Sequence, residues 1–191
     1  MRAGPFMRDS DVILIRRAFW EDVPAIEAMQ HASIRTLNSR DYTAEQIRGF
    51  LTYFASIDEQ LIDDKCLFVV EVSGDIIGSG GWSQASMKLR RLCGLERASA
   101  PGESRAGVID IRSVFVHPLW TRRGIGSLMM KILEARAQAA GYHRADVIAT
   151  MTGAPLYRAL GYRELAQPSL TLPNGLMLPA VYLQKPLAPL H

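Results

Sequence analysis

The 191-residue sequence contains only two cysteines, Cys66 and Cys93, and a single pair cannot form a disulfide framework. No spacing of cysteine and histidine matches a zinc site. No apolar run approaches the roughly 18 residues of a membrane-spanning helix. The N-terminal segment MRAGPFMRDS also lacks the apolar stretch of a secretory signal. These absences predict a cytoplasmic protein with reduced thiols that binds no metal and no membrane.

The chain also has little excess charge of either sign. It carries 22 Lys+Arg against 19 Asp+Glu, a net charge of +3, and the basic residues are scattered rather than clustered. This distribution argues against a nucleic-acid partner. Hydrophobic residues make up 48% of the chain, which excludes disordered, collagen-like and coiled-coil proteins. The composition therefore predicts a single globular domain over residues 1–191.

The hydrophobic pattern predicts an alternation of strands and helices. The predicted strands span residues 12–17, 67–72, 76–82, 108–116, 144–150, 165–172 and 176–184. The predicted helices span residues 23–37, 43–54, 124–140 and 155–160. The resulting order, β-α-α-β-β-β-α-β-α-β-β, predicts an α+β fold around one mixed sheet. Its one clear crossover between parallel strands runs from 108 to 150.

Local signals mark where several of these elements begin or turn. Thr43 and Gln46 match a capping box at the start of the second helix. Ser73-Gly74-Asp75 predicts a hairpin turn between two strands, and Asn174-Gly175 predicts another before the last strand. This final hairpin and the last strand would offer a sheet edge that could pair two protomers as a homodimer.

The segment Ser83–Gly107 has a different composition. It combines serine, glycine and alanine with four arginines, Arg90, Arg91, Arg97 and Arg105. We predict a long surface loop or a poorly ordered insertion, and such loops in compact domains are often functional. The arginines are read as a solvated face, because no aromatic platform for stacked bases accompanies them.

The most informative segment is VFVHPLWTRRGIGS, residues 114–127. It predicts the end of a strand, a short basic turn and two glycines that open an amphipathic helix. The first N–H groups of a helix lack internal partners and lie at the positive end of the helix dipole. Gly124 and Gly126 carry no side chain to block a close approach, and Arg122 and Arg123 add positive charge. The segment therefore indicates a site for phosphate or pyrophosphate.

This glycine spacing matches neither the P-loop nor the dinucleotide-binding fingerprint. A tight turn whose glycines serve packing alone is the simpler alternative. From these residues alone, we infer only a protein that binds a phosphorylated ligand.

Two motifs together resemble the GNAT superfamily of acetyl-CoA-dependent N-acetyltransferases. VFVHPLWTRRGIGSLMM is similar to its signature motif, and APLYRALGY, about 30 residues later, is similar to its second motif. The resemblance covers residues 12–186. It implies a GNAT-type mixed central sheet flanked by helices, with acetyl-CoA as co-substrate.

The resemblance also implies roles for individual residues. Tyr157 would protonate the departing thiolate as a general acid. Val114, Phe115 and Val116 would offer backbone groups to the pantetheine arm of the cofactor. The pyrophosphate would be wrapped by main-chain N–H groups of Arg122, Arg123, Gly124, Ile125, Gly126 and Ser127.

Three positions depart from the family pattern. Thr121 stands where the family prefers glutamine or arginine, and Thr150 stands where a cofactor-binding asparagine is frequent. Asp110 occupies the position of a glutamate that sometimes acts as general base, but its side chain is shorter. His31 or a chain of water molecules is an alternative base.

The acceptor site is predicted less specifically. His31 lies in the first helix, Tyr42 between the first two helices and Trp82 at the end of a strand, and each could line an acceptor pocket. For Trp82, core packing is the competing interpretation. Neither cysteine lies near the two motifs in sequence, so we expect direct attack in a ternary complex.

The predicted reaction moves an acetyl group from acetyl-CoA to a primary amine of a small molecule or peptide. Three alternatives stay open, because a fold does not fix a function. They are transfer of a longer acyl group, transfer to an oxygen acceptor, and a non-catalytic sensor that binds acyl-CoA.

Overall fold

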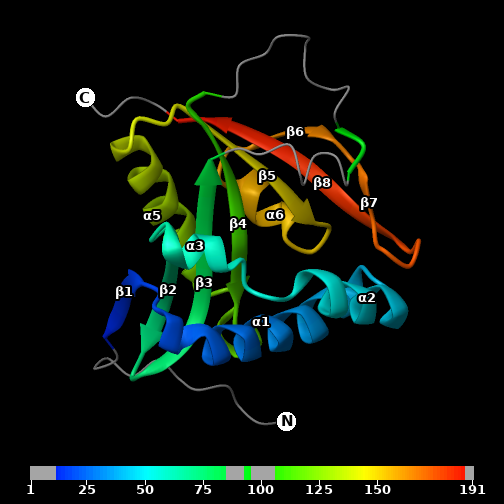
Figure 1. Ribbon diagram of the computed structural model, residues 1–191, viewed down its shortest axis with the longest axis horizontal. Coiled ribbons are helices and arrows are strands. Elements are labelled where there is room, and N and C mark those ends of the chain that lie inside the picture. The colour runs from blue at the N-terminus through cyan, green and yellow to red at the C-terminus, as the bar shows by residue number, and fades with distance from the viewer. Residues whose placement is uncertain (1–11, 85–92, 96–105, 188–191) are drawn as a thin grey trace.

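Eight strands form one mixed sheet in the computed structural model, which describes residues 12–84, 93–95 and 106–187 (Figure 1). The strands are β1 (Ile13–Arg17), β2 (Leu67–Val72), β3 (Asp75–Gln84), β4 (Val108–Val116), β5 (Arg144–Thr150), β6 (Arg163–Ala166), β7 (Ser169–Thr171) and β8 (Met177–Pro186). Their order across the sheet is β1-β2-β3-β4-β5-β8-β6, and β7 pairs with β8. Neighbouring strands are antiparallel except β4 and β5, which are parallel.

The described helices are α1 (Val23–Leu37), α2 (Ala44–Phe54), α3 (Glu59–Asp63), α5 (Ile125–Ala139) and α6 (Ala154–Ala159). Short 3-10 turns span Trp20–Asp22, Asn38–Arg40 and Pro118–Trp120. Helix α5 connects the two parallel strands β4 and β5, as the predicted crossover requires.

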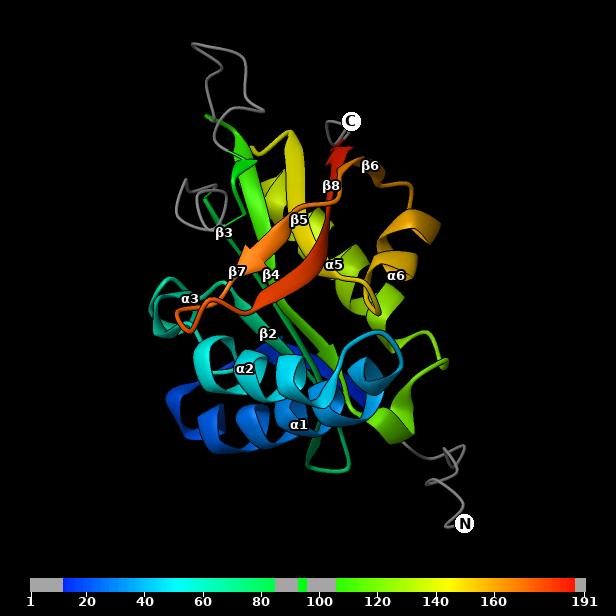
Figure 2. The same ribbon diagram turned by 90° about the vertical axis from the view of Figure 1, so that its right-hand side faces the viewer.

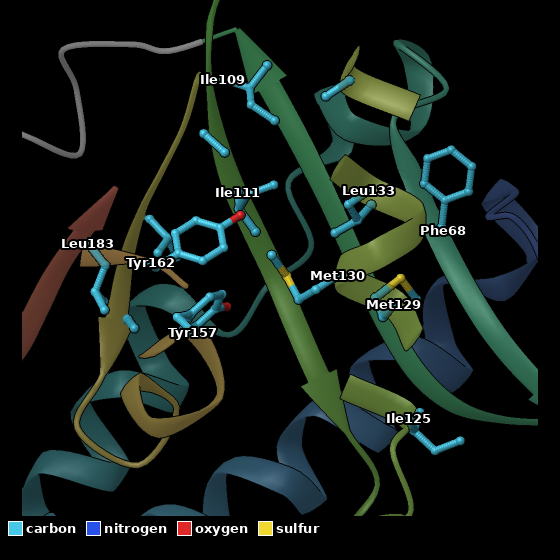
Figure 3. Packing of buried hydrophobic residues seen from close by; sticks show 14 of the residues in the cluster. Phe68, Ile109, Ile111, Ile125, Met129, Met130, Leu133, Tyr157, Tyr162 and Leu183 are labelled. Atoms are coloured by element: carbon cyan, nitrogen blue, oxygen red, sulfur yellow. The ribbon is translucent and has the colours of Figure 1, made fainter. Parts of the chain in front are cut away.

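Alternate side chains of β2 separate the two faces of the sheet, because successive residues of a strand point in opposite directions. Phe68 and Val70 belong to a core cluster with Met129 and Leu133 of α5 (Figure 3). Leu67 and Val69 belong to a second cluster with Ile26 of α1. Helix α5 therefore covers one face of the sheet, and α1 covers the other (Figures 1 and 2).

The structure confirms the predicted order of the main elements and several of their boundaries. Strands β2, β4 and β5 have the predicted limits. The capping box is also present, since the Gln46 N–H donates to Thr43 Oγ1 at 3.2 Å and the Thr43 N–H donates to Gln46 Oε1 at 2.9 Å. These features are local, so the chain around them is sufficient to specify them.

Two predictions about the elements were wrong, and one helix was missed. The single strand expected over 165–172 is two strands, β6 and β7, because Pro168 between them has no N–H to donate to a ladder. Helix α3 was not predicted. The last strand is not a sheet edge, because β8 pairs with β5 on one side and with β6 and β7 on the other.

The segment 83–107 also differs in part from the predicted surface loop. Its first two residues, Ser83 and Gln84, extend β3. Cys93 and Leu95 are buried in a cluster with Leu170 and other residues of the C-terminal strands. Residues 85–92 and 96–105, with all four arginines, lie outside the described residues. Among the helices that the structure describes, none is long and apolar enough to cross a membrane.

Candidate active site

Strands β4 and β5 separate partway along their length. They pair in parallel from Val108 and Arg144 as far as Ile111 and Val147, yet each continues for several residues beyond that point. A bulge in β4 accompanies the separation: three steps from Arg112 to Phe115 face only two steps of β3, from Gly81 to Ser79. Ser113 in the bulge has φ +55°, a conformation that L-residues rarely adopt.

A cleft of about 640 Å³ occupies the space where the strands diverge. Val114, Phe115 and Val116 line it from β4, and Thr150 lines it from β5. Because β4 has left β5 at this point, its main-chain groups on that side have no strand partner. A ligand with amide groups could therefore pair with β4 as an added strand.

The turn between β4 and α5 closes one end of the cleft. Arg122 has φ +62° and Gly124 has φ +82°, so two left-handed residues reverse the chain immediately before the helix. The first intrahelical bond runs from the Leu128 N–H to the Gly124 carbonyl at 2.9 Å. The N–H groups of Ile125, Gly126 and Ser127 precede this bond, and these residues line the cleft.

The two glycines of this turn serve different purposes. Gly124 provides the positive φ. Gly126 provides space, since a Cβ there would lie 3.1 Å from Leu156 of α6. Together they bring bare main-chain N–H groups to the cleft at the positive end of α5, which favours an anion.

The side chains of the two arginines in this turn have different surroundings. Arg122 is exposed and lines the cleft beside the helix N-terminus. The guanidinium of Arg123 lies over the Trp120 ring, 5.0 Å from its centroid, and Arg123 is not among the residues that line the cleft. The side-chain charge next to the free amides therefore comes from Arg122.

Tyr157 of α6 faces the cleft from the other side. It is 5% exposed and packs edge-on against Tyr162, with ring centroids 5.6 Å apart (Figure 3). Burial raises the pKa of Tyr157 well above the usual value near 10. No described residue forms a hydrogen bond with its hydroxyl. Tyr157 is therefore a phenol that keeps its proton and has no competing partner in the described structure.

Tyr42 and Thr150 also line the cleft, but their hydroxyls have protein partners. The Tyr42 hydroxyl donates to the Pro179 carbonyl at 2.5 Å and accepts from the Met151 N–H at 2.9 Å. Burial raises the pKa of Tyr42, so this donor stays protonated. Thr150 Oγ1 accepts from the Gly153 N–H at 3.0 Å, in the turn before α6.

Besides Arg123, three predicted site residues are not among those that line the cleft: Asp110, His31 and Trp82. Asp110 is buried and stands opposite Asp146 in the register of β4 and β5. It therefore lies in the part of β4 that is still paired with β5. His31 does not line the cleft, although its neighbour Gln30 on α1 does. Trp82 packs edge-on against Tyr142, with centroids 5.1 Å apart, as the core-packing interpretation predicted.

Other cleft residues were not predicted from the sequence. Phe50 and Phe54 of α2 line it with stacked rings 6.1 Å apart. Asp58 and Arg112, joined as an ion pair, also line it. Gln30 of α1 lines it as well, and it is almost completely buried. The only signal for Gln30 was a polar residue within the apolar stripe of its helix.

Comparison with known proteins identifies the family. The model of the acetyltransferase (GNAT) family matches residues 31–162, which is more than half of the chain. The chain belongs to this family. This GNAT protein is therefore an acyltransferase. It has the α+β fold that its order of strands and helices predicted, with the mixed sheet that the resemblance implied. No curated protein matches its sequence.

Solved structures share this fold at low sequence identity. A GCN5-related N-acetyltransferase from Rhodopseudomonas palustris superposes with a TM-score of 0.68 at 22% identity, covering 91% of this chain and 95% of that one. The PaiA N-acetyltransferase from Thermoplasma acidophilum, in complex with coenzyme A, gives 0.65 at 13% identity, covering 92% and 99%. A phosphinothricin acetyltransferase from Sinorhizobium meliloti, in complex with acetyl-CoA, gives 0.61 at 18% identity, covering 92% and 89%. The ligands of the last two agree with acetyl-CoA, the co-substrate predicted for this GNAT protein.

Proposed function

We propose that this GNAT protein transfers an acetyl group from acetyl-CoA to a primary amine of a small molecule or peptide, by direct attack in a ternary complex. One observation carries the proposal. The cleft combines an anion-binding helix start, an unpaired length of strand and a protonated phenol with no hydrogen-bond partner in the described structure.

We assign acetyl-CoA to the part of the cleft lined by the end of β4 and the start of α5, which we call the cofactor half. The N–H groups of Ile125, Gly126 and Ser127, with the Arg122 side chain, suit the pyrophosphate of acetyl-CoA. Val114 to Val116 of β4 suit the amide groups of the pantetheine arm. Thr150 lies across the gap on β5.

Tyr157 is assigned as the general acid. During the reaction the amine nitrogen bonds to the thioester carbon, the carbon–sulfur bond breaks, and the leaving sulfur takes the phenolic proton. The raised pKa of Tyr157 keeps the phenol protonated before the reaction, and it favours return of a proton from water to the phenolate after the reaction. A main-chain N–H of the β4 bulge can donate to the carbonyl oxygen as it gains charge.

Direct attack fits the positions of the cysteines. Neither Cys66 nor Cys93 lines the cleft, and burial raises the pKa of both thiols, that of Cys93 to about 11. A neutral thiol away from the cleft is a poor nucleophile, so an acyl-enzyme on cysteine is not supported. Both cysteines are free, which agrees with a reducing compartment and supports the cytoplasm as the site of action.

We assign water as the acceptor of the proton that the incoming amine loses. Asp110 and His31, the two side chains considered as bases, do not line the cleft. Asp58 does line it but is held in an ion pair with Arg112. Water in the cleft is therefore the path by which the proton leaves.

The remaining part of the cleft, which we call the acceptor half, favours an amine with an apolar body. Its walls include Leu37, Ile47, Phe50, Phe54, Leu170 and Leu178. Apolar walls favour a ligand that removes apolar surface from water, and they disfavour a polyamine whose charges would be desolvated without partners. We therefore expect aralkyl or branched alkyl primary amines to be better acceptors than polyamines.

A thiol-release assay with acetyl-CoA tests the proposal. The panel contains 2-phenylethylamine, isoamylamine, spermidine and a short peptide with a free N-terminus, and calorimetry measures coenzyme A binding in parallel. We expect coenzyme A to bind and thiol release to be fastest with an apolar primary amine. Coenzyme A binding without turnover of any amine would favour the sensor instead, and absence of binding would exclude both.

A further inference from the structure

A buried chain of hydrogen bonds links α1 to the bulge in β4. Gln30 Nε2 of α1 donates to Ser79 Oγ of β3 at 3.1 Å, and Ser79 Oγ donates to the carbonyl of Ser113 at 2.9 Å. Ser79 is completely buried, and Gln30 is 2% exposed. These groups are almost sealed from bulk solvent, so they must satisfy one another.

The direction of each bond in this chain is fixed by chemistry. A carbonyl oxygen can only accept, and a serine hydroxyl has a single hydrogen to donate. The Ser79 hydrogen therefore goes to the Ser113 carbonyl, and Ser79 Oγ must receive a hydrogen from its other neighbour. Only the NH₂ group of the Gln30 amide can supply one, so Gln30 Oε1 is directed away from Ser79.

Gln30 Oε1 is therefore an oriented acceptor at the cleft. Gln30 lines the cleft, and no described residue donates a hydrogen bond to Oε1. This oxygen is also not among the partnerless polar atoms that are sealed from solvent, so it keeps an opening on the cleft side. A nearly buried amide oxygen without a protein partner is suited to an N–H donor on a ligand.

The position of Gln30 indicates which ligand supplies that donor. It comes from α1, next to the Ser113 bulge from which Val114 to Val116 continue along the cofactor half. Through Ser79, the Gln30 amide is therefore two hydrogen bonds away from the bulge, whose main chain the proposed function assigns to the thioester carbonyl.

We propose that Gln30 binds the acceptor amine, with Oε1 accepting one N–H of the attacking nitrogen. This inference rests on the proposed function. The Gln30 amide moves no proton. As the carbon–nitrogen bond forms and the carbon–sulfur bond breaks, one hydrogen stays on the nitrogen and remains hydrogen-bonded to Oε1, and the other leaves to water. Tyr157 supplies the proton that the sulfur takes.

This arrangement selects primary amines over secondary ones. After attack, the nitrogen of a primary amine carries two hydrogens, one for Gln30 and one to lose. The nitrogen of a secondary amine carries only one, so losing it leaves Gln30 Oε1 without a partner. An unpaired buried polar group is costly, which makes hydrogen-bonding sites selective.

The test compares the best primary amine of the panel with its N-methyl derivative. For Gln30→Leu, we expect kcat/KM with the primary amine to fall about 10- to 100-fold, the range for loss of one hydrogen bond to a charged group. With the N-methyl amine, it is expected to change less than about threefold, and coenzyme A affinity is expected to stay unchanged. Met29→Leu, a change of similar volume at the next buried position of α1, is the control for packing.

Ser79→Ala is the second variant, in case Gln30→Leu folds poorly. It leaves Gln30 in place but removes the group that orients its amide, so the preference for the primary amine is expected to shrink. An equal loss with both amines, or an unchanged preference in a folded variant, would overturn the role of Gln30. A wild-type protein that binds no coenzyme A or releases no thiol would instead overturn the proposed function.

Discussion

The hydroxyl of Tyr42 accepts a hydrogen bond from the main-chain N–H of Met151, a residue 109 positions further along the chain. The same hydroxyl donates to the Pro179 carbonyl of β8. Beside it, Thr152 Oγ1 donates to Asp41 at 2.7 Å, and Gln46 Nε2 donates to the Met177 carbonyl at 2.9 Å. These contacts join α2 and the segment before it to the opposite wall of the cleft. The single hydroxyl oxygen of Tyr42 makes two of the bonds.

Removing that oxygen is expected to destabilise the protein. In Tyr42→Phe, the Met151 N–H and the Pro179 carbonyl both lose a partner, at a cost of about 1–3 kcal/mol in the free energy of unfolding. Because the two walls are joined by fewer hydrogen bonds, KM for the amine is also expected to rise. Urea unfolding and initial-rate kinetics measure the two effects.

Tyr53→Phe is the matched control for this change. Tyr53 is exposed on α2 and takes part in none of these bonds, so its variant is expected to stay within about 0.5 kcal/mol of the wild type. Equal stability of the two variants would show that the Tyr42 hydroxyl does not join the walls.

Gly124→Ala and Gly141→Ala form a second matched pair. Both glycines flank α5 at positive φ, +82° and +86°, and neither has an atom within 4 Å of an added Cβ. Each variant is expected to lose about 1–2 kcal/mol of stability from left-handed strain. Only Gly124→Ala is expected to weaken coenzyme A binding, by about tenfold, because it displaces the N–H groups that face the pyrophosphate.

Calorimetric titration with coenzyme A distinguishes the two glycine variants. If Gly141→Ala lost as much affinity for coenzyme A as Gly124→Ala, the loss would reflect lower stability of the whole fold and not the N–H groups of the turn. Unchanged affinity in Gly124→Ala would remove the phosphate role from this turn.

Tyr157→Phe tests the acid directly. The ring and its packing against Tyr162 remain, and only the proton donor is lost. We expect kcat to fall about 10²-fold or more while coenzyme A affinity stays the same. Stopped-flow detection of thiol release measures the first quantity, and calorimetry measures the second. Turnover at the wild-type rate would show that water, and not Tyr157, protonates the sulfur.

Alkaline pH is expected to destabilise the fold through its buried tyrosines. Burial raises the pKa of Tyr42, Tyr157 and Tyr162, while an unfolded tyrosine ionises near 10. Below pH 10 all of them are protonated in both states, so they add no pH dependence. Above it the unfolded chain releases protons that the folded chain retains. The free energy of unfolding then falls by up to about 1.4 kcal/mol per pH unit for each tyrosine.

Urea unfolding between pH 8 and pH 11 checks this expectation. The slope above pH 10 is expected to be shallower in Tyr157→Phe than in the wild type, and unchanged in Tyr53→Phe. A wild-type stability that stays flat up to pH 11 would contradict the burial of these phenols.

The glycine turn before α5 was predictable from the sequence because its information is local. Gly124 supplies a backbone conformation, and the helix that follows supplies free N–H groups wherever it begins. The same holds for the Thr43 capping box, whose two partners lie three residues apart. No distant residue is needed to specify either feature.

The acceptor side was predicted poorly, because it depends on which way each side chain faces. His31 was chosen for its chemistry, yet its neighbour Gln30 lines the cleft. Successive residues of a helix lie about 100° apart, so adjacent positions face different surroundings. Asp110 was chosen by its place in the motif. The sheet keeps it inside because β4 and β5 diverge only after Ile111.

The sequence by itself determined the order of the elements, the glycine turn at the start of α5 and the membership in the GNAT family that its two motifs indicate. These properties reside in backbone conformation and short-range spacing. Only the tertiary structure decided that Gln30, Phe50 and Arg112 meet Tyr157 in one cleft, and that Asp110 and Trp82 lie outside it. These residues are far apart in sequence, and their meeting depends on a bulge in β4 and on the separation of two strands that no local pattern records.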